Sequence, residues 1–197
     1  MATKITLKNV RLGPYPNLWT ARQYKGAGDF NYDAAFYVPK NSPAAKELLS
    51  AYDKVAREGW GDKAPAMLAQ IKGNPNRTFL INGDDLAGQD GTAGHLVIKG
   101  KRKKNDGRVD VRSRDGKSQI LPEDGIIYAG CTVHAVVEIW AQTKEYPGLR
   151  LKLLGVQFIA DGDALLGAGS SASDEDFENL DAGEGSPDAP EVGGGYV

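Results

Sequence analysis

Alternating apolar and polar positions predict β-strands near both ends of the first 160 residues. Residues 4–12 alternate with a slip of phase in the middle, which is typical of a strand with one wet, cationic face. The clearest strand is predicted over residues 126–141. Its apolar face carries Cys131, Val133, Ala135, Val137 and Ile139. Over residues 150–159 the apolar phase turns over beside Gly155, which predicts a bulge or bend of the kind that small closed barrels need.

The residues between these strands predict more β-structure and a helical insert. A glycine-rich turn leads into a strand over about residues 32–38, and a short strand is predicted over residues 78–81. Ser42-Pro43 is typical of a helix cap followed by a first-turn proline, and helical spacing of apolar residues continues to about residue 58. A shorter helix is predicted around residues 64–71. We interpret both helices as packing elements.

Cations crowd residues 95–117, where two short β-like runs, residues 96–98 and 109–112, flank a loop. Nine lysines and arginines stand there against three aspartates. Like charges packed this closely repel one another unless water or a polyanion neutralises them. We therefore interpret the segment as a basic hairpin that is either simply solvated or in contact with a polyanion.

Charge is segregated along the 197 residues, although the formal net charge is only −2. Residues 161–197 hold ten Asp and Glu and no Lys or Arg, which leaves 24 basic and 16 acidic residues in residues 1–160. The acidic segment is also poor in apolar residues and cannot bury enough surface to offset its ordering entropy. We predict a folded body over residues 1–160 and a disordered acidic tail over residues 161–197. A basic body with an acidic tail favours a polyanion-binding protein that carries its own competitor.

The composition argues against several functional classes. The single Cys131 cannot form an intramolecular disulfide and excludes a Cys-rich zinc site. No apolar run approaches the roughly 18 residues of a membrane helix, and no hydrophobic segment follows Met1. His95 and His134 are the only histidines, and we interpret His134 as a hydrogen-bonded structural residue. We expect a cytoplasmic protein with no bound metal, cofactor or membrane partner.

Aromatic residues are concentrated early in the chain, where seven stand between Tyr15 and Tyr37 among several cations. Bases stack on such rings at about 1–3 kcal/mol each while Lys and Arg contact the phosphates, and stacking tolerates any base. With the predicted strands, this pattern favours a single-stranded nucleic-acid-binding protein of little sequence preference. Its common host is the OB-fold. We predict a mainly β fold: an OB-fold-like, five-stranded antiparallel barrel with one or two helices.

Four segments together resemble a bacteriophage family of single-stranded-DNA-binding proteins. They are NVRLGPYPNLWTARQYKGAGDFNYDAAFYVPK, GHLVIKGKRK, DGIIYAGCTVHAVVEIWA and SASDEDFENL. The resemblance implies an OB-fold body, a groove for single-stranded DNA and a flexible acidic tail that contacts replication proteins. This chain departs from the usual pattern in its early helical insert, and in a tail that ends in Gly-Gly-Gly-Tyr-Val rather than in acidic residues and a terminal Phe.

The candidate DNA-binding residues combine cations of the basic hairpin with rings and cations of the early aromatic segment. They are Arg11, Tyr15, Trp19, Tyr24, Lys25, Tyr32, Tyr37, Lys40, Lys99, Lys101, Arg102, Lys103, Lys104, Arg108, Arg112 and Arg114. Of these, the resemblance itself covers Arg11, Tyr15, Trp19, Tyr32, Lys40, Lys101 and Arg102. Trp140 is a further candidate for stacking.

We expect a non-enzymatic, sequence-tolerant single-stranded-DNA-binding protein of phage replication and recombination, whose tail competes for the DNA groove and recruits partner proteins. Three alternatives stay open. One is a metal-dependent single-strand nuclease, in which Asp84, Asp85 and Asp90 could hold Mg²⁺. The others are a single-strand annealing protein that uses the same groove and an interaction module that acts through the tail alone. No pattern in the sequence indicates an oligomeric state.

Overall fold

The computed structural model describes residues 2–86, 88–89 and 91–165, which form eight strands and two α-helices. The strands are β1 (Ala2–Leu12), β2 (Asn17–Tyr24), β3 (Ala27–Pro39), β4 (Leu80–Asn82), β5 (His95–Lys103), β6 (Asp110–Arg112), β7 (Thr132–Gln142) and β8 (Gly148–Ala160). The helices are α1 (Pro43–Trp60) and α2 (Ala64–Ile71), and the 3₁₀ turns are η1 (Gly61–Lys63), η2 (Gly83–Asp85), η3 (Lys104–Asp106) and η4 (Pro122–Asp124). The predicted mainly β fold with a helical insert is confirmed.

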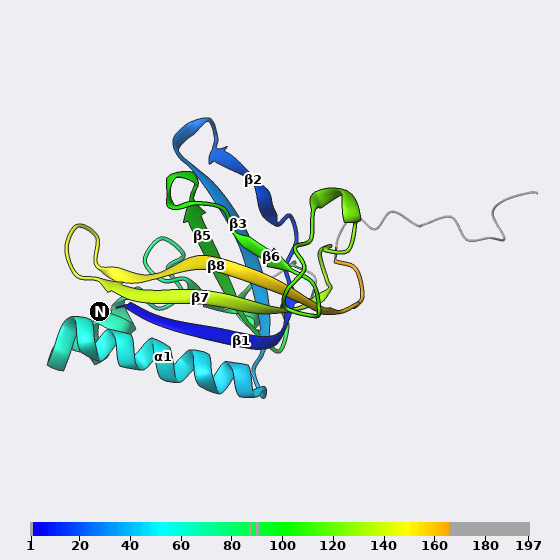
Figure 1. Cartoon of the computed structure of the whole chain (residues 1–197). Coiled ribbons are helices and arrows are strands. Elements are labelled where there is room, and N and C mark those ends of the chain that lie inside the picture. Colours follow the sequence, from blue (N-terminus) through cyan, green and yellow to red (C-terminus); the bar gives the residue numbers. More distant parts are fainter. Residues whose placement is uncertain (1, 87, 90, 166–197) are drawn as a thin grey trace, which may run out of the picture. The chain divides into compact units, whose positions relative to one another are not determined.

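Five strands close a barrel in the order β1–β3–β5–β8–β7, with β7 returning to β1 (Figure 1). Four of the five joints are antiparallel, and the joint between β5 and β8 is parallel, with Lys101 opposite Lys152. The five-stranded barrel is confirmed, but its description as antiparallel is wrong at this joint. The reason is geometric, because a ring with an odd number of strands cannot alternate in direction at every joint.

Three strands lie outside this ring. Strand β2 pairs with β3 to form a hairpin, which we call the arm, β4 pairs with β5, and β6 pairs in parallel with β8. The arm turns at Lys25 and Gly26, both with positive φ, as in the two-residue turns that match the twist of paired strands. The predicted basic hairpin is therefore wrong, since β5 and β6 each pair with β8 rather than with one another.

Both predicted breaks in strand periodicity are present. In β1 the register with β7 shifts between Leu7 and Val10, where Asn9 has a φ of 54°. In β8 the shift falls beside Gly155, opposite Val136 and Val137 of β7. Each bulge reverses the face of the following residues and bends the strand around the barrel.

The helical insert lies between β3 and β5, and both of its predicted helices are confirmed. The Ser42 hydroxyl accepts a hydrogen bond from the Ala45 N–H at 3.1 Å and so caps α1. Leu48 and Val55 are fully buried on the face of α1 that packs against β1 and β7. No helix in the part of the chain that the structure describes is long and apolar enough to cross a membrane.

The barrel core is formed by the inward faces of its strands. The predicted apolar face of β7 is fully buried along its length. Residues 161–165, the beginning of the predicted tail, also lie against the body: Leu165 is 5% exposed, and its N–H donates to the Ala129 carbonyl at 2.9 Å. Its side chain packs in a second cluster with Tyr37 and Val97. The prediction of disorder for residues 166–197 lies outside the described residues.

His134 has the structural role predicted for it, and this gives a pH dependence. Its Nδ1 accepts a hydrogen bond from the Asn9 N–H at 3.1 Å, beside the β1 bulge. Burial, with a smaller effect of Lys8, lowers the pKa of His134 below its ordinary value of 6.5. Because the unfolded chain then binds this proton more readily than the folded one, stability should fall as the pH drops below 6.5 toward the lowered folded pKa.

We therefore expect the free energy of unfolding to decline from about pH 7.5 to about pH 5.5, and to decline less in His134→Asn, whose amide oxygen can still accept the Asn9 bond without titrating. Urea unfolding at the two pH values measures this. An equal decline in both proteins would show that His134 does not carry the effect.

Candidate nucleic-acid interface

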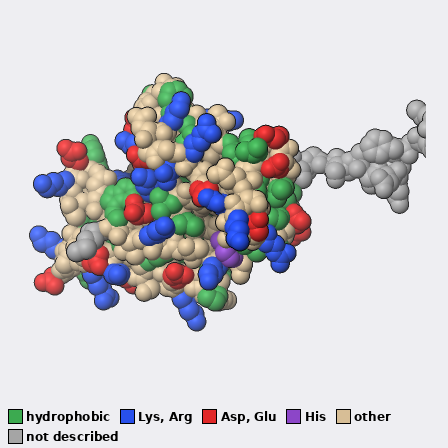
Figure 2. All heavy atoms as spheres, in the orientation of Figure 1, with side chains coloured by type: hydrophobic (Ala, Val, Ile, Leu, Met, Phe, Trp, Pro, Cys, Tyr) green, Lys and Arg blue, Asp and Glu red, His purple; other side chains and the backbone are tan. Residues whose placement is uncertain are grey.

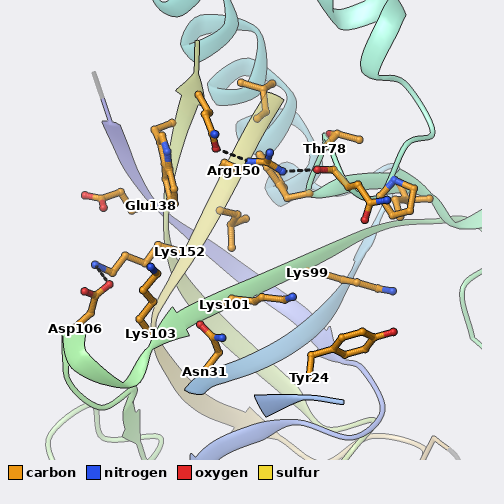
Figure 3. A pocket seen from close by; sticks show the side chains of 18 residues that line it. Tyr24, Asn31, Thr78, Lys99, Lys101, Lys103, Asp106, Glu138, Arg150 and Lys152 are labelled. Carbon is orange, nitrogen blue, oxygen red and sulfur yellow. Dashed lines mark hydrogen bonds and ion pairs between the residues drawn. The ribbon is translucent and has the colours of Figure 1, made fainter. Parts of the chain in front are cut away.

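A groove of about 870 Å³ crosses the outer surface of the barrel over β5, β8 and β7 (Figure 3). Strand β5 contributes three lysines to it, β8 contributes Arg150 and Lys152, and β7 contributes Glu138 and Trp140. Tyr24 and Asn31 of the arm, Asp106 of η3 and several residues between 75 and 81 also line it. The groove thus gathers side chains from segments that are far apart in the sequence.

Strand alternation places the three lysines of β5 in this groove. Lys99, Lys101 and Lys103 are exposed, whereas Gly100 between them is buried. Because successive side chains point to opposite faces, the three ammonium groups form a row with their Cα atoms about 7 Å apart. These three predicted residues are therefore brought together as expected.

Lys152 is a fourth lysine of the groove, and sequence reasoning missed it. It stands opposite Lys101 at the parallel joint of β5 and β8. The available signal was the alternation of Arg150 and Lys152 with the buried residues Leu149, Leu151 and Leu153. Alternation alone marked one polar face of β8 but could not say which strand would lie beside it.

Ion pairs divide the four lysines into two sets. Lys103 lies 2.7 Å from Asp29, and Lys152 lies 2.7 Å from Asp106. Within the described residues, the ammonium groups of Lys99 and Lys101 make no ion pair or side-chain hydrogen bond. Figure 3 shows these two on the same side of the groove as Tyr24.

Arg150, in contrast, is fully engaged in holding loops together. Its guanidinium donates to the Asn76 carbonyl at 2.6 Å, to Gln142 Oε1 at 3.1 Å and to the Tyr146 carbonyl at 3.3 Å. These bonds tie the loop before β4 to the turn between β7 and β8. Arg150 therefore shapes one end of the groove rather than offering a free cation.

Three aromatic residues line the groove, and of these Phe79 is buried. Tyr24, at the end of β2, is 74% exposed, and the Lys25 ammonium lies 5.5 Å from its ring centroid. Trp140 on β7 is half-buried and also lines the groove. An exposed ring beside free ammonium groups is the arrangement that single-stranded nucleic acid requires.

The other predicted rings lie elsewhere. Tyr32 and Tyr37 are 4% and 2% exposed, so the expectation that they stack on bases is wrong. Tyr32 lies on the inward face of β3, and Tyr37, on the opposite face, is covered by a second cluster that includes Val97 and Leu165. Trp19 is half-buried and donates from Nε1 to the Ile120 carbonyl at 3.0 Å. Tyr15 is 76% exposed in the loop after β1 but does not line the groove.

Several predicted cations also serve local structure. Arg102 points away from the groove and donates to the Gly107 and Asp106 carbonyls at 2.9 and 2.6 Å, which closes the turn after β5. Arg112 binds Asp110 at 2.8 Å and the Lys117 carbonyl at 2.8 Å. These guanidinium groups hold turns together.

The remaining predicted cations lie outside the groove lining. Arg11 donates to the Asp163 carbonyl, and Lys40 pairs with Asp84. The other four are exposed to solvent: Lys25, Lys104, Arg108 and Arg114. Basic and acidic side chains are intermixed on the face shown in Figure 2, so charge alone does not mark the site.

Of the carboxylates considered for a metal, Asp84 is engaged in other contacts. Asp84 accepts from Lys40 and from the Gly94 N–H at 2.7 Å, and these bonds lower the pKa of its carboxyl. Asp90 lies outside the described residues. Among the residues that are described, no three His, Cys, Asp or Glu are grouped so that they could hold a metal ion.

Comparison with known proteins gives the groove its context. The family model of the single-stranded-DNA-binding protein of Enterobacter phage Enc34 matches residues 3–187. Putative protein p50 of Acyrthosiphon pisum secondary endosymbiont phage 1 is 37% identical over 183 residues, which cover 92% of this chain and 96% of that protein.

Two solved structures share the fold. The Enc34 protein in complex with single-stranded DNA is similar with a TM-score of 0.66 and 24% identity, over 83% of this chain and 89% of that one. The single-stranded-DNA-binding protein gp2.5 of bacteriophage T7 is similar with a TM-score of 0.53 and 14% identity, over 95% and 100%. The family match covers nearly the whole chain, and the resemblance seen in the sequence is confirmed: the chain belongs to the family of the single-stranded-DNA-binding protein of Enterobacter phage Enc34.

Proposed function

We propose that this protein binds single-stranded DNA in the groove over β5, β8 and β7, without catalysing a reaction and with little preference for sequence. Its setting would be the replication and recombination of phage DNA in the cytoplasm of a bacterial host. The observation that carries the proposal is the convergence of four lysines with Tyr24 and Trp140 in one groove. The solved complex of the Enc34 relative with single-stranded DNA supports the choice of ligand.

The chemistry of the groove suits a strand of any sequence. An ammonium group is a point charge on a flexible stem, so it contacts a phosphate without demanding one orientation. Tyr24 and Trp140 offer ring faces, and every base has a face that can stack on them. The guanidinium groups nearby, which could read base edges in pairs of bonds, are instead occupied by backbone carbonyls.

We also propose that the acidic segment competes for the groove and, when displaced by DNA, is free to contact replication or recombination proteins. The ten acidic residues of residues 161–197, with no basic residue among them, support this role. A competitor on the same chain acts at an effective concentration of order millimolar, which is enough to weaken loose binding.

The first prediction concerns the unpaired lysines. Lys99→Ala with Lys101→Ala should weaken binding of oligo-dT roughly tenfold at low salt. It should also make the slope of log K against log salt shallower by about 1.4, because two phosphate contacts are lost. Fluorescence anisotropy at several salt concentrations measures both.

The matched control is Lys46→Ala with Lys63→Ala, which removes the same charge from exposed positions on α1 and η1. Equal weakening in both double variants would mean that only net charge matters and that the groove is not the site. The same samples with Mg²⁺ added should keep the oligonucleotide intact, and cleavage would favour the nuclease alternative.

The second prediction separates the two exposed tyrosines. Tyr24→Ala should cost about 1–3 kcal/mol of binding free energy through loss of stacking, whereas Tyr15→Ala, equally exposed but outside the groove, should bind as the unaltered protein does. Titration with oligo-dT gives both affinities. The assignment of the groove would be refuted by the opposite order.

The third prediction tests the acidic segment. A chain ending at Leu165 keeps the packed residues 161–165 and lacks only residues 166–197. We expect it to bind oligo-dT more tightly than the full chain at low salt, with the difference shrinking as salt screens the attraction. If the shortened chain binds no more tightly, the acidic segment is not a competitor.

A further inference from the structure

Two of the four groove lysines already have an anion beside them. Lys103 contacts Asp29 and Lys152 contacts Asp106, each at 2.7 Å. Both carboxylates come from outside strands β5 and β8, since Asp29 lies near the tip of the arm and Asp106 in turn η3. The other two groove lysines, Lys99 and Lys101, lie on the same side of the groove as Tyr24 (Figure 3). Their side chains have no such partner among the described residues.

Hydrogen bonds hold the backbone of the two residues that carry these carboxylates. The backbone carbonyl of Asp106 accepts a hydrogen bond from Arg102 at 2.6 Å, and the carbonyl of Asp29 accepts one from Asn31 at 2.7 Å. The bond from Lys152 lowers the pKa of Asp106, and the bond to Asp29 raises the pKa of Lys103.

We propose that Asp29 and Asp106 are built-in competitors for DNA phosphates, so that the groove has an open end and a guarded end. The open end is formed by Lys99, Lys101 and Tyr24, and the guarded end by Lys103 and Lys152. This inference rests on the proposed single-stranded-DNA function of the same groove. It gives two acidic residues, Asp29 and Asp106, a role in a site that is otherwise basic and aromatic.

The energetics follow from exchange of one anion for another. A phosphate that reaches Lys152 must displace the Asp106 carboxylate, which costs little because exposed ion pairs are weak. The binding free energy gained from a phosphate at Lys152 is also smaller than at Lys101, because contact with a lysine that is already paired with a carboxylate releases fewer counterions. A bound strand would therefore be held mainly at the open end and exchanged readily at the guarded end.

A double-mutant cycle on Asp106 and Lys152 tests the proposal with oligo-dT in the full chain. Asp106→Asn should tighten binding roughly two- to fivefold at low salt and steepen the salt slope by about 0.7. Lys152→Gln should weaken binding less than Lys101→Gln in the unaltered chain. In the Asp106→Asn background, however, Lys152→Gln should weaken binding as much as Lys101→Gln does, and this non-additivity is the signature of competition.

The control is Glu58→Gln, which removes the same charge from the Lys54–Glu58 ion pair on α1, outside the groove. It should leave affinity unchanged. The proposal is wrong if Asp106→Asn does not tighten binding, or tightens it equally when Lys152 is already Gln, since that would be a general effect of charge. A parallel cycle on Asp29 and Lys103 guards against one variant failing to fold, with thermal unfolding as the check.

The two proposals fail in different ways. If the unaltered chain does not bind oligo-dT at low salt, the proposed function is wrong and this inference falls with it. If the unaltered chain binds and the Asp106 and Asp29 variants bind no more tightly, only the inference is overturned.

Discussion

The odd number of strands in the barrel is the constraint on which the site depends. Five strands cannot alternate in direction around a closed ring, so one joint must be parallel, and here it joins β5 to β8. At that joint Gly100 leaves room for the Leu151 side chain of β8, since a Cβ there would lie 2.6 Å from Leu151 Cδ2. The outer faces of the same strands carry Lys101 and Lys152 side by side. The groove thus follows the joint between β5 and β8 that closes the barrel, and its lysines lie along that joint.

The two kinds of cation have separate tasks in this molecule. Arginines near the groove, such as Arg102 and Arg150, spread several donors over backbone carbonyls and fix the turns that bound it. Lysines point into the groove with one compact charge each. A guanidinium fork suits rigid planar arrangements of acceptors, whereas an ammonium adapts to a phosphate that moves. The flexible lysine side chains therefore remain available to contact a flexible ligand.

Local pattern was enough to predict the local elements. The helix cap at Ser42, the buried face of β7 and the bulge beside Gly155 all follow from neighbours in the sequence. The pairing of β5 and β6 with β8 did not follow, because partners more than forty residues apart leave no mark on either strand. For the same reason Lys152 was missed as a groove residue. Aromatic density likewise could not tell exposed Tyr24 from interior Tyr32, since that depends on which face of a strand meets the core.

The strands outside the ring bear on how copies of this protein could sit next to one another. Among the described residues, β2 and β4 lie at the two ends of the strand order, and both β4 and β6 are only three residues long. Short edges give a neighbouring chain little backbone to pair with. Proteins lined up along one DNA strand meet at very high local density, where open sheet edges would invite aggregation. Outer strands as short as β4 and β6 leave little backbone for such pairing between neighbouring copies.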